Sequence, residues 1–232
     1  RSHVSARFPV RGQTSGLNER SRIQGRRDLV ARSFLILHGV NGSGLDHWQT
    51  YLAHRLRQRG ETVFYPELPD NTEPDCATWR AALREELANI ADPEHLTVVC
   101  HSLGCILWMH HALDPGDCPV DRLILVAPPG PSIIEEFRPT FHPVTIGADQ
   151  FNASAKDILL VSTDADPRCS ETASVCYGNR WGIRAIVLHP SAEHINTASG
   201  FGEWPAMASL CLARGLPDHL LDALADIVPE RP

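Results

Sequence analysis

This 232-residue sequence has no apolar run approaching the roughly 18 residues that a membrane-spanning helix needs, so we expect no membrane-spanning segment. Its cysteines and histidines form no C-x-x-C pair, no H-E-x-x-H motif and no other metal-ligand spacing. A structural metal is therefore not indicated. The motifs G-x-G-x-x-G and G-K-[ST] are missing as well, which leaves little support for a nucleotide site.

Positive charge is scarce outside the first 32 residues. Residues 1–32 carry eight arginines against two acidic residues, which is a net charge of +6. The net charge of the whole chain is −7, so residues 33–232 have a net charge of −13. An acidic main region argues against a nucleic-acid partner. The first 32 residues are polar and aperiodic, which predicts a disordered basic extension, a cloning remnant or an upstream start-site artefact. An arginine-rich transit peptide is the other interpretation.

The length and the cysteine pattern bound the class of protein. A chain of 232 residues holds one sizeable α/β core and is too short for two comfortable domains. Seven cysteines are an odd number with no regular spacing, so we expect reduced, buried thiols and a cytoplasmic location.

Six short apolar runs bounded by turn residues predict buried strands at 33–38, 62–65, 96–99, 122–127, 157–162 and 184–189. Helices are predicted after caps at Asp46 and at Asp75 or Thr78, after Leu103, and at 206–214 and 217–228. This alternation predicts an α/β fold with a mainly parallel central sheet. About 27 irregular residues separate the fourth and fifth strands, which leaves no room for a large cap domain.

The stretch L-T-V-V-C-H-S-L-G-C-I-L at 96–107 predicts a strand, a sharp turn with Ser102 at its tip, and a helix. Such a turn lifts a weak hydroxyl nucleophile clear of the strand and places it beside unpaired helix N–H groups. The flanking small residues are Cys100 and Gly104, where the G-x-S-x-G pattern has glycine at both positions. The alternative is a serine that only caps the helix.

A loop with three glycines follows the first predicted strand, from His38 to Gly44. Its first turn is suited to directing a backbone N–H at an oxyanion, with Val40 as the favoured donor and Leu103 as the second. A phosphate cradle is the alternative explanation for the glycines.

Two further candidates lie just beyond predicted strands. Asp166 follows the strand at 157–162, and His194 follows the strand at 184–189. Functional residues collect at the carboxyl ends of parallel strands, and the order Ser102, Asp166, His194 matches nucleophile, acid and base in one class of hydrolases. Asp166 is also placed to cap a helix near Ser170, and Asp164 is a rival acid.

These motifs resemble the small serine-hydrolase family of YdeN-like and retinoblastoma-binding-protein-like α/β-hydrolases. The matching stretches are His38–Gly39, Asp46–Gln49, Cys100–Gly104, Leu125–Pro129, Asp166–Pro167, Cys169–Ser170, His194–Gly202 and Trp204–Pro205. The resemblance covers about residues 33–214, and the run that begins at His194 is its most specific part. Cys100 in place of the usual glycine and an acid loop one residue longer depart from the family pattern.

The resemblance implies a single three-layer α/β-hydrolase domain over residues 33–232, with Ser102 as nucleophile, Asp166 as acid, His194 as base and no cofactor. We expect a serine hydrolase with a rather open site, most simply a carboxylesterase for small acyl esters. Small amides are a second substrate class. A catalytically weak protein-interaction module of the same fold is the alternative, and a thiol enzyme using Cys100 or Cys105 is a more distant third.

Overall fold

A computed structural model of the chain describes residues 32–114, 119–169 and 177–227. The extension predicted at the amino terminus lies outside the described residues, apart from Arg32. The Arg32 guanidinium donates a 2.7 Å hydrogen bond to the carbonyl of Leu212 and contacts the Glu61 carboxylate at 2.8 Å.

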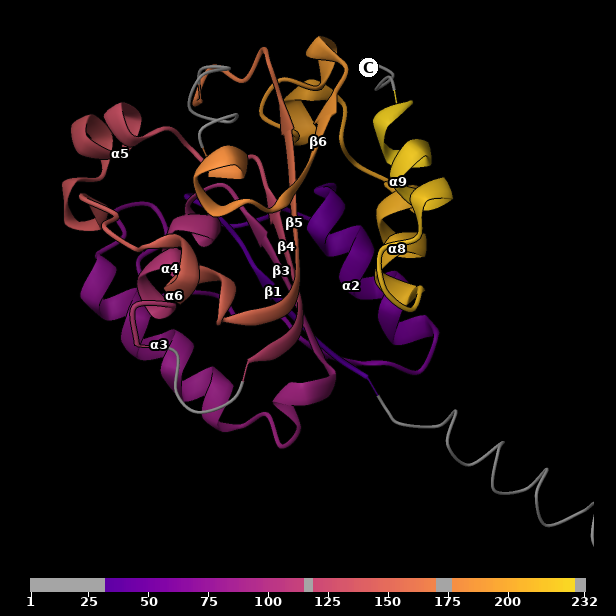
Figure 1. The fold of residues 1–232 in the computed structure, drawn as a ribbon, viewed down its shortest axis with the longest axis horizontal. Helices are drawn as coiled ribbons and strands as arrows, with labels where there is room; N and C mark the ends of the chain where they lie inside the picture. The colour runs from indigo at the N-terminus through magenta and orange to yellow at the C-terminus, as the bar shows by residue number, and fades with distance from the viewer. Residues whose placement is uncertain (1–31, 115–118, 170–176, 228–232) are drawn as a thin grey trace, which may run out of the picture. The chain divides into compact units, whose positions relative to one another are not determined.

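The centre of the domain is a six-stranded sheet in the order β2-β1-β3-β4-β5-β6, and every neighbouring pair is parallel (Figure 1). Its strands are β1 (Ser33–Leu37), β2 (Thr62–Phe64), β3 (Leu96–His101), β4 (Val120–Val126), β5 (Ala155–Thr163) and β6 (Arg184–Leu188). The predicted α/β class with a parallel central sheet is confirmed.

Helices cover both faces of the sheet, which completes three layers (Figure 1). One side carries α2 (Trp48–Gln58), α8 (Pro205–Leu212) and α9 (Asp218–Ala225). The other carries α3 (Cys76–Ala88), α4 (Leu103–His111) and α6 (Ala148–Asn152), with α5 (Pro131–Phe137) beside them. Short 3-10 helices, η1 to η4, span Pro93–His95, Pro139–Phe141, Pro190–Ala192 and Thr197–Ser199.

The strands are continuous apolar runs because both of their faces are buried. In β1, Leu35 and Leu37 pack into the core under α3 and α4, whereas Phe34 and Ile36 pack into the core under α2, α8 and α9. All four side chains are fully buried. Because successive side chains point to opposite faces of the sheet, each strand contributes side chains to both cores.

Two local predictions differ from the structure. His47, and not Asp46, caps α2, because His47 has the extended backbone of a cap residue and its side chain accepts a hydrogen bond from the Gln49 N–H. The stretch between β4 and β5 is not irregular throughout, since α5 and α6 lie within it. Both helices are short, and no large cap is inserted in the residues described there. Asp75 caps α3 as predicted.

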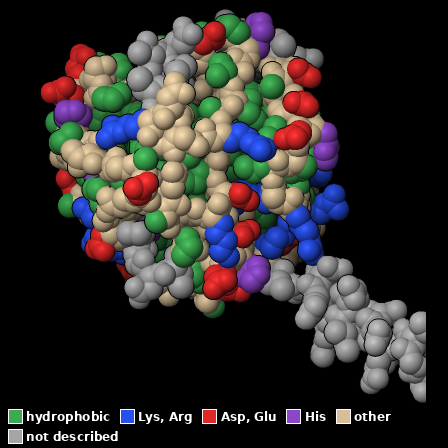
Figure 2. Space-filling model, in the orientation of Figure 1, with side chains coloured by type: hydrophobic (Ala, Val, Ile, Leu, Met, Phe, Trp, Pro, Cys, Tyr) green, Lys and Arg blue, Asp and Glu red, His purple; other side chains and the backbone are tan. Residues whose placement is uncertain are grey.

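The visible face mixes acidic, basic and apolar side chains (Figure 2). The large apolar side chains that are exposed in the described part of the chain are Leu45, Phe137 and Val187. None of the described helices is both long enough and apolar enough to cross a membrane.

Candidate active site

Ser102 occupies a sharp turn between β3 and α4. Its backbone has φ 52° and ψ −123°, a conformation that is uncommon for a residue with a side chain. The Ser102 N–H still bonds to the carbonyl of Val126 at 3.0 Å, so the turn begins directly at the end of the sheet ladder. The hydroxyl makes no capping bond to α4, which excludes the helix-cap alternative in this structure.

Gly104 allows the beginning of α4 to approach the end of the neighbouring strand β1 closely. A Cβ atom at this position would lie 2.7 Å from the Leu37 carbonyl oxygen and 2.8 Å from that of His38. Only glycine fits such a contact without backbone movement. At the other flanking position Cys100 is fully buried in the core that faces α4, so the strand accepts a small side chain where glycine is usual.

The structure brings the three predicted side chains together. His194 Nε2 lies 2.9 Å from Ser102 Oγ, and His194 Nδ1 lies 2.9 and 2.8 Å from the two carboxylate oxygens of Asp166. An ionised Asp166 accepts the Nδ1–H, which leaves Nε2 free to accept the serine proton. The arrangement can move the hydroxyl proton from Ser102 to His194 without moving any backbone.

Asp166 is held by its own loop. Its Oδ1 accepts a 2.8 Å hydrogen bond from the Arg168 N–H, and its side chain is 2% exposed. Asp164, the rival acid, is exposed at the beginning of the same loop. Of the two aspartates, the structure places Asp166 beside the imidazole.

The loop after β1 lies directly over the nucleophile. A Cβ atom on Gly39 would be 2.8 Å from Ser102 Cβ and 3.2 Å from its Oγ. The next residue is Val40, whose N–H has no acceptor among the described residues. Leu103 is the first residue of α4, so its N–H has no partner within the helix. Both N–H groups therefore lack a backbone acceptor among the described residues.

His38 fixes the peptide that carries the Val40 N–H. The backbone N–H of Leu68 donates to His38 Nε2 at 2.9 Å, so the neutral ring carries its proton on Nδ1 and donates it to the Gly39 carbonyl at 2.7 Å. In a planar trans peptide the C=O and the following N–H point in opposite directions. Holding the Gly39 carbonyl on one side therefore directs the Val40 N–H to the other.

Two more histidines lie behind the base. The His101 ring lies 5.2 Å from that of His194 and 5.0 Å from that of His47, measured between centroids. Burial lowers the pKa of His47 to about 4, with the charges of His194 and His38 adding to the effect. Burial lowers the pKa of His101 well below its usual value. Both rings are therefore neutral at physiological pH.

Sequence patterns did not single out His38, His47 or His101 as parts of the site. The sequence places His38 at the beginning of a glycine-rich loop and His101 in the turn, and both belong to stretches that match the family, but no pattern assigns either of them a role in the site. Their position could have identified two of them, because His38 and His101 lie at the carboxyl ends of β1 and β3, where functional residues gather.

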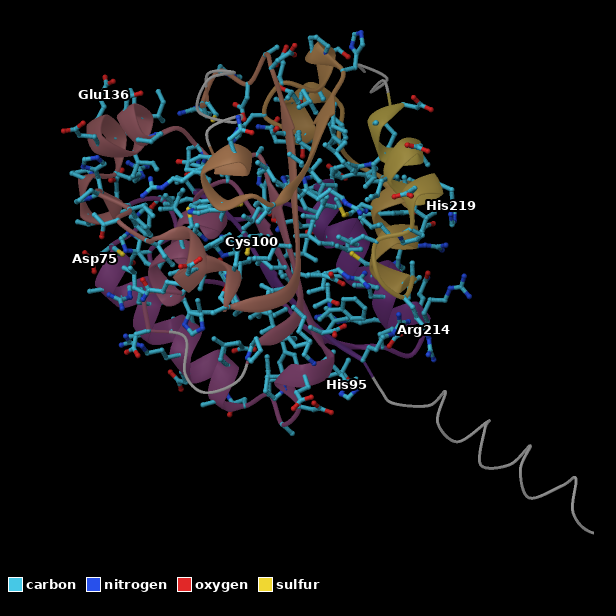
Figure 3. The ribbon with its side chains drawn as sticks, viewed as in Figure 1. Asp75, His95, Cys100, Glu136, Arg214 and His219 are labelled. Carbon is cyan, nitrogen blue, oxygen red and sulfur yellow. The ribbon has the colours of Figure 1, made fainter. Side chains whose placement is uncertain are left out.

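Thiol chemistry fits this site poorly. Cys100 and Cys105 are fully buried, and burial raises the pKa of each thiol, so neither is a ready thiolate. Figure 3 shows Cys100 in the interior of the domain. Across the described ranges, no three histidine, cysteine, aspartate or glutamate side chains are grouped so that they could hold a metal ion.

Comparison with known proteins gives one family match and several solved structures of similar fold. A family model described as serine hydrolase matches residues 34–212. The ydeN gene product of B. subtilis superposes with a TM-score of 0.70 at 18% identity, covering 78% of this chain and 96% of that one. A YdeN-like hydrolase from Pectobacterium atrosepticum gives 0.62 at 20% identity, covering 90% and 99%. Est1E of Butyrivibrio proteoclasticus, solved with ferulic acid, gives 0.56 at 15%, covering 84% and 87%. No curated protein sequence matches the chain.

Proposed function

This chain belongs to the serine hydrolase family, and we propose that it is a carboxylesterase that cleaves small acyl esters through an acyl-enzyme on Ser102. The observation that carries the proposal is the continuous set of hydrogen bonds from Ser102 through His194 to Asp166. The resemblance to YdeN-like serine hydrolases drawn from the sequence is confirmed.

In the first half-reaction, Ser102 Oγ attacks the ester carbonyl carbon while His194 Nε2 accepts the hydroxyl proton. Asp166 keeps the His194 Nδ1–H in place and stabilises the imidazolium that forms. The tetrahedral intermediate then collapses, the bond to the leaving alkoxide breaks, and His194 returns its proton to that oxygen. The products of this step are the free alcohol and an ester on Ser102.

In the second half-reaction, His194 accepts a proton from water as the water oxygen attacks the acyl-enzyme carbonyl. Collapse of this second intermediate breaks the bond to Ser102 Oγ, which takes back the proton from His194 and releases the carboxylic acid. In both steps the oxyanion accepts hydrogen bonds from the N–H groups of Val40 and Leu103. Loss of one such donor typically lowers kcat by a factor of about 10²–10³.

Small substrates suit the surroundings of the nucleophile. The described residues between β4 and β5 form only the short helices α5 and α6 and one 3-10 turn. Ser102 itself is partly exposed. With so little cover, the site offers limited area for long acyl chains, so we expect the highest kcat/KM for short-chain esters. Small amides are the second class to be tested.

The test is covalent labelling with a fluorophosphonate, followed by intact-mass measurement. Ser102 Oγ attacks phosphorus and fluoride leaves, so the wild type should gain one phosphonyl group and Ser102→Ala none. Ser191 is a matched control, because its Oγ lies 2.9 Å from His189 Nδ1 in an exposed serine–histidine pair. Ser191→Ala should label like the wild type.

An adduct lost only in Ser102→Ala would support an activated nucleophile. A series of p-nitrophenyl esters of increasing acyl length would then define the substrate preference. If the folded wild type gains no adduct at all, the esterase proposal is wrong and the interaction-module alternative takes its place.

A further inference from the structure

Three successive carbonyls around His194 each accept a hydrogen bond from a different part of the fold. Thr163 Oγ1 at the end of β5 donates to the Glu193 carbonyl at 2.9 Å. His101 Nε2 at the end of β3 donates to the His194 carbonyl at 3.1 Å. Trp48 Nε1 at the beginning of α2 donates to the Ile195 carbonyl at 2.8 Å. We call residues 193–195 the base loop.

The base loop has a backbone conformation that it would not adopt alone. Glu193 has φ 43° and Ile195 has φ 51°, so the residues on both sides of His194 have positive φ. For a β-branched residue such as Ile195 a positive φ is a genuine outlier. Conformations of this kind persist only where the surrounding structure over-determines them, and they concentrate at functional sites.

The donors are themselves rigid. Trp48 is fully buried, and His101 is 5% exposed. Their rings meet edge-to-face with centroids 5.7 Å apart, and Trp48 packs in the same way against Trp204 at 5.2 Å. Because neither ring has room to rotate, each N–H is held in a fixed direction before the base loop bonds to it.

We propose that His101 and Trp48 are positioning residues that hold His194 in its reactive orientation through the backbone of the base loop. The inference rests on the proposed function, because it assigns a purpose to the placement of the base. His101 directly precedes Ser102, so one strand end carries the nucleophile and also fixes the position of the base. A shift of β3 would move both together and preserve the Ser102–His194 distance.

A purely structural role makes a different prediction. If His101 only filled the core, its replacement by another buried ring would lower stability and leave kcat unchanged. The matched control is His110 on α4, which is 8% exposed and donates from Nε2 to the Phe141 carbonyl at 2.8 Å. It makes the same kind of bond without touching the base loop.

The first experiment compares kcat and KM for a short-chain ester in three variants. His101→Phe keeps a ring but removes the donor, so kcat should fall about tenfold, as expected for one lost buried hydrogen bond, with KM unchanged. His101→Gln restores an N–H donor and should recover most of that loss. His110→Phe should keep the wild-type kcat. Equal kcat values in His101→Phe and His110→Phe would overturn the proposal.

A second measurement needs no turnover. The proton on His194 Nδ1 is hydrogen-bonded to Asp166, so it should give a far-downfield NMR signal in the resting protein when the ring is held in place. The signal should shift or broaden in His101→Phe and in Trp48→Phe but not in His110→Phe. An unchanged signal in both positioning variants would overturn the proposal, and this result does not depend on whether the protein reacts with the fluorophosphonate. If the wild type is not labelled by the fluorophosphonate, that result refutes the esterase assignment instead.

Discussion

Acidification should destabilise the folded protein through its buried histidines, and His47 allows the effect to be calculated. Its ring is 7% exposed, and burial lowers its pKa from 6.5 to about 4. Between these two values the unfolded chain binds a proton that the folded protein does not. The stability contributed by neutral His47 is therefore present above pH 6.5 and is lost progressively as the pH falls from 6.5 to about 4.

The magnitude follows from the two pKa values. The pKa of His47 is 6.5 in the unfolded state and about 4 in the folded state. By proton linkage, this difference lowers the free energy of unfolding by about 2 kcal/mol between about pH 7.5 and pH 5. The complete effect, reached below pH 4, is about 3 kcal/mol. A domain of this size has a free energy of unfolding of about 5–15 kcal/mol, so one histidine accounts for a large part of it.

The measurement is denaturant unfolding of the wild type and of His47→Asn at about pH 7.5 and pH 5. Asparagine retains a side-chain oxygen to cap α2 but does not titrate, so the variant should lose about 2 kcal/mol less than the wild type on acidification. His54, an exposed histidine on the same helix, provides the control, and His54→Asn should reproduce the wild-type difference. An identical pH dependence in His47→Asn and wild type would refute the reasoning.

Three further predictions concern the reaction and the elbow. Asp166→Asn should lower kcat by about 10⁴ in an ester assay, since the amide cannot hold the productive His194 tautomer, while Asp164→Asn should stay close to wild type. His38→Phe should lower kcat by about 10–100-fold with KM unchanged, because the Gly39 carbonyl loses its donor and the peptide carrying the oxyanion N–H is no longer fixed; a full wild-type kcat would contradict this. Gly104→Ala should cost about 1–3 kcal/mol of stability in chemical denaturation, because its Cβ would lie 2.7 Å from a backbone oxygen.

The sheet and the three candidate residues were predictable because each depends on a short, local pattern. A buried parallel strand is a continuous apolar run, and its end is marked by the first polar or turn residue after it. Ser102, Asp166 and His194 all lie at or just beyond such ends. Since parallel strands present all their carboxyl ends at one edge, a correct list of strands brings these residues together without knowledge of the packing.

The residues that hold the site in place could not be found in this way. A bond from Trp48 Nε1 to the Ile195 carbonyl joins positions 147 residues apart, and the acceptor is backbone, which carries no sequence signature. The same holds for the bond from His101 to the His194 carbonyl. The misplaced cap of α2 has a related cause. Aspartate is the stronger cap by propensity, but only His47 has the extended backbone that a cap requires in this fold.

The geometry of the site and the acid sensitivity of the protein are coupled, because His38 and His47 can accept their hydrogen bonds only as neutral rings. His38 accepts a hydrogen bond from the Leu68 N–H at Nε2, and His47 accepts one from the Gln49 N–H at Nδ1. Protonation turns each of these acceptors into a donor and breaks the bond. The first bond fixes the loop after β1, which carries the N–H of Val40, and the second fixes the beginning of α2, from which Trp48 reaches the base loop. Burial keeps both rings neutral, so the same desolvation that preserves the geometry of the site also makes the protein sensitive to acid.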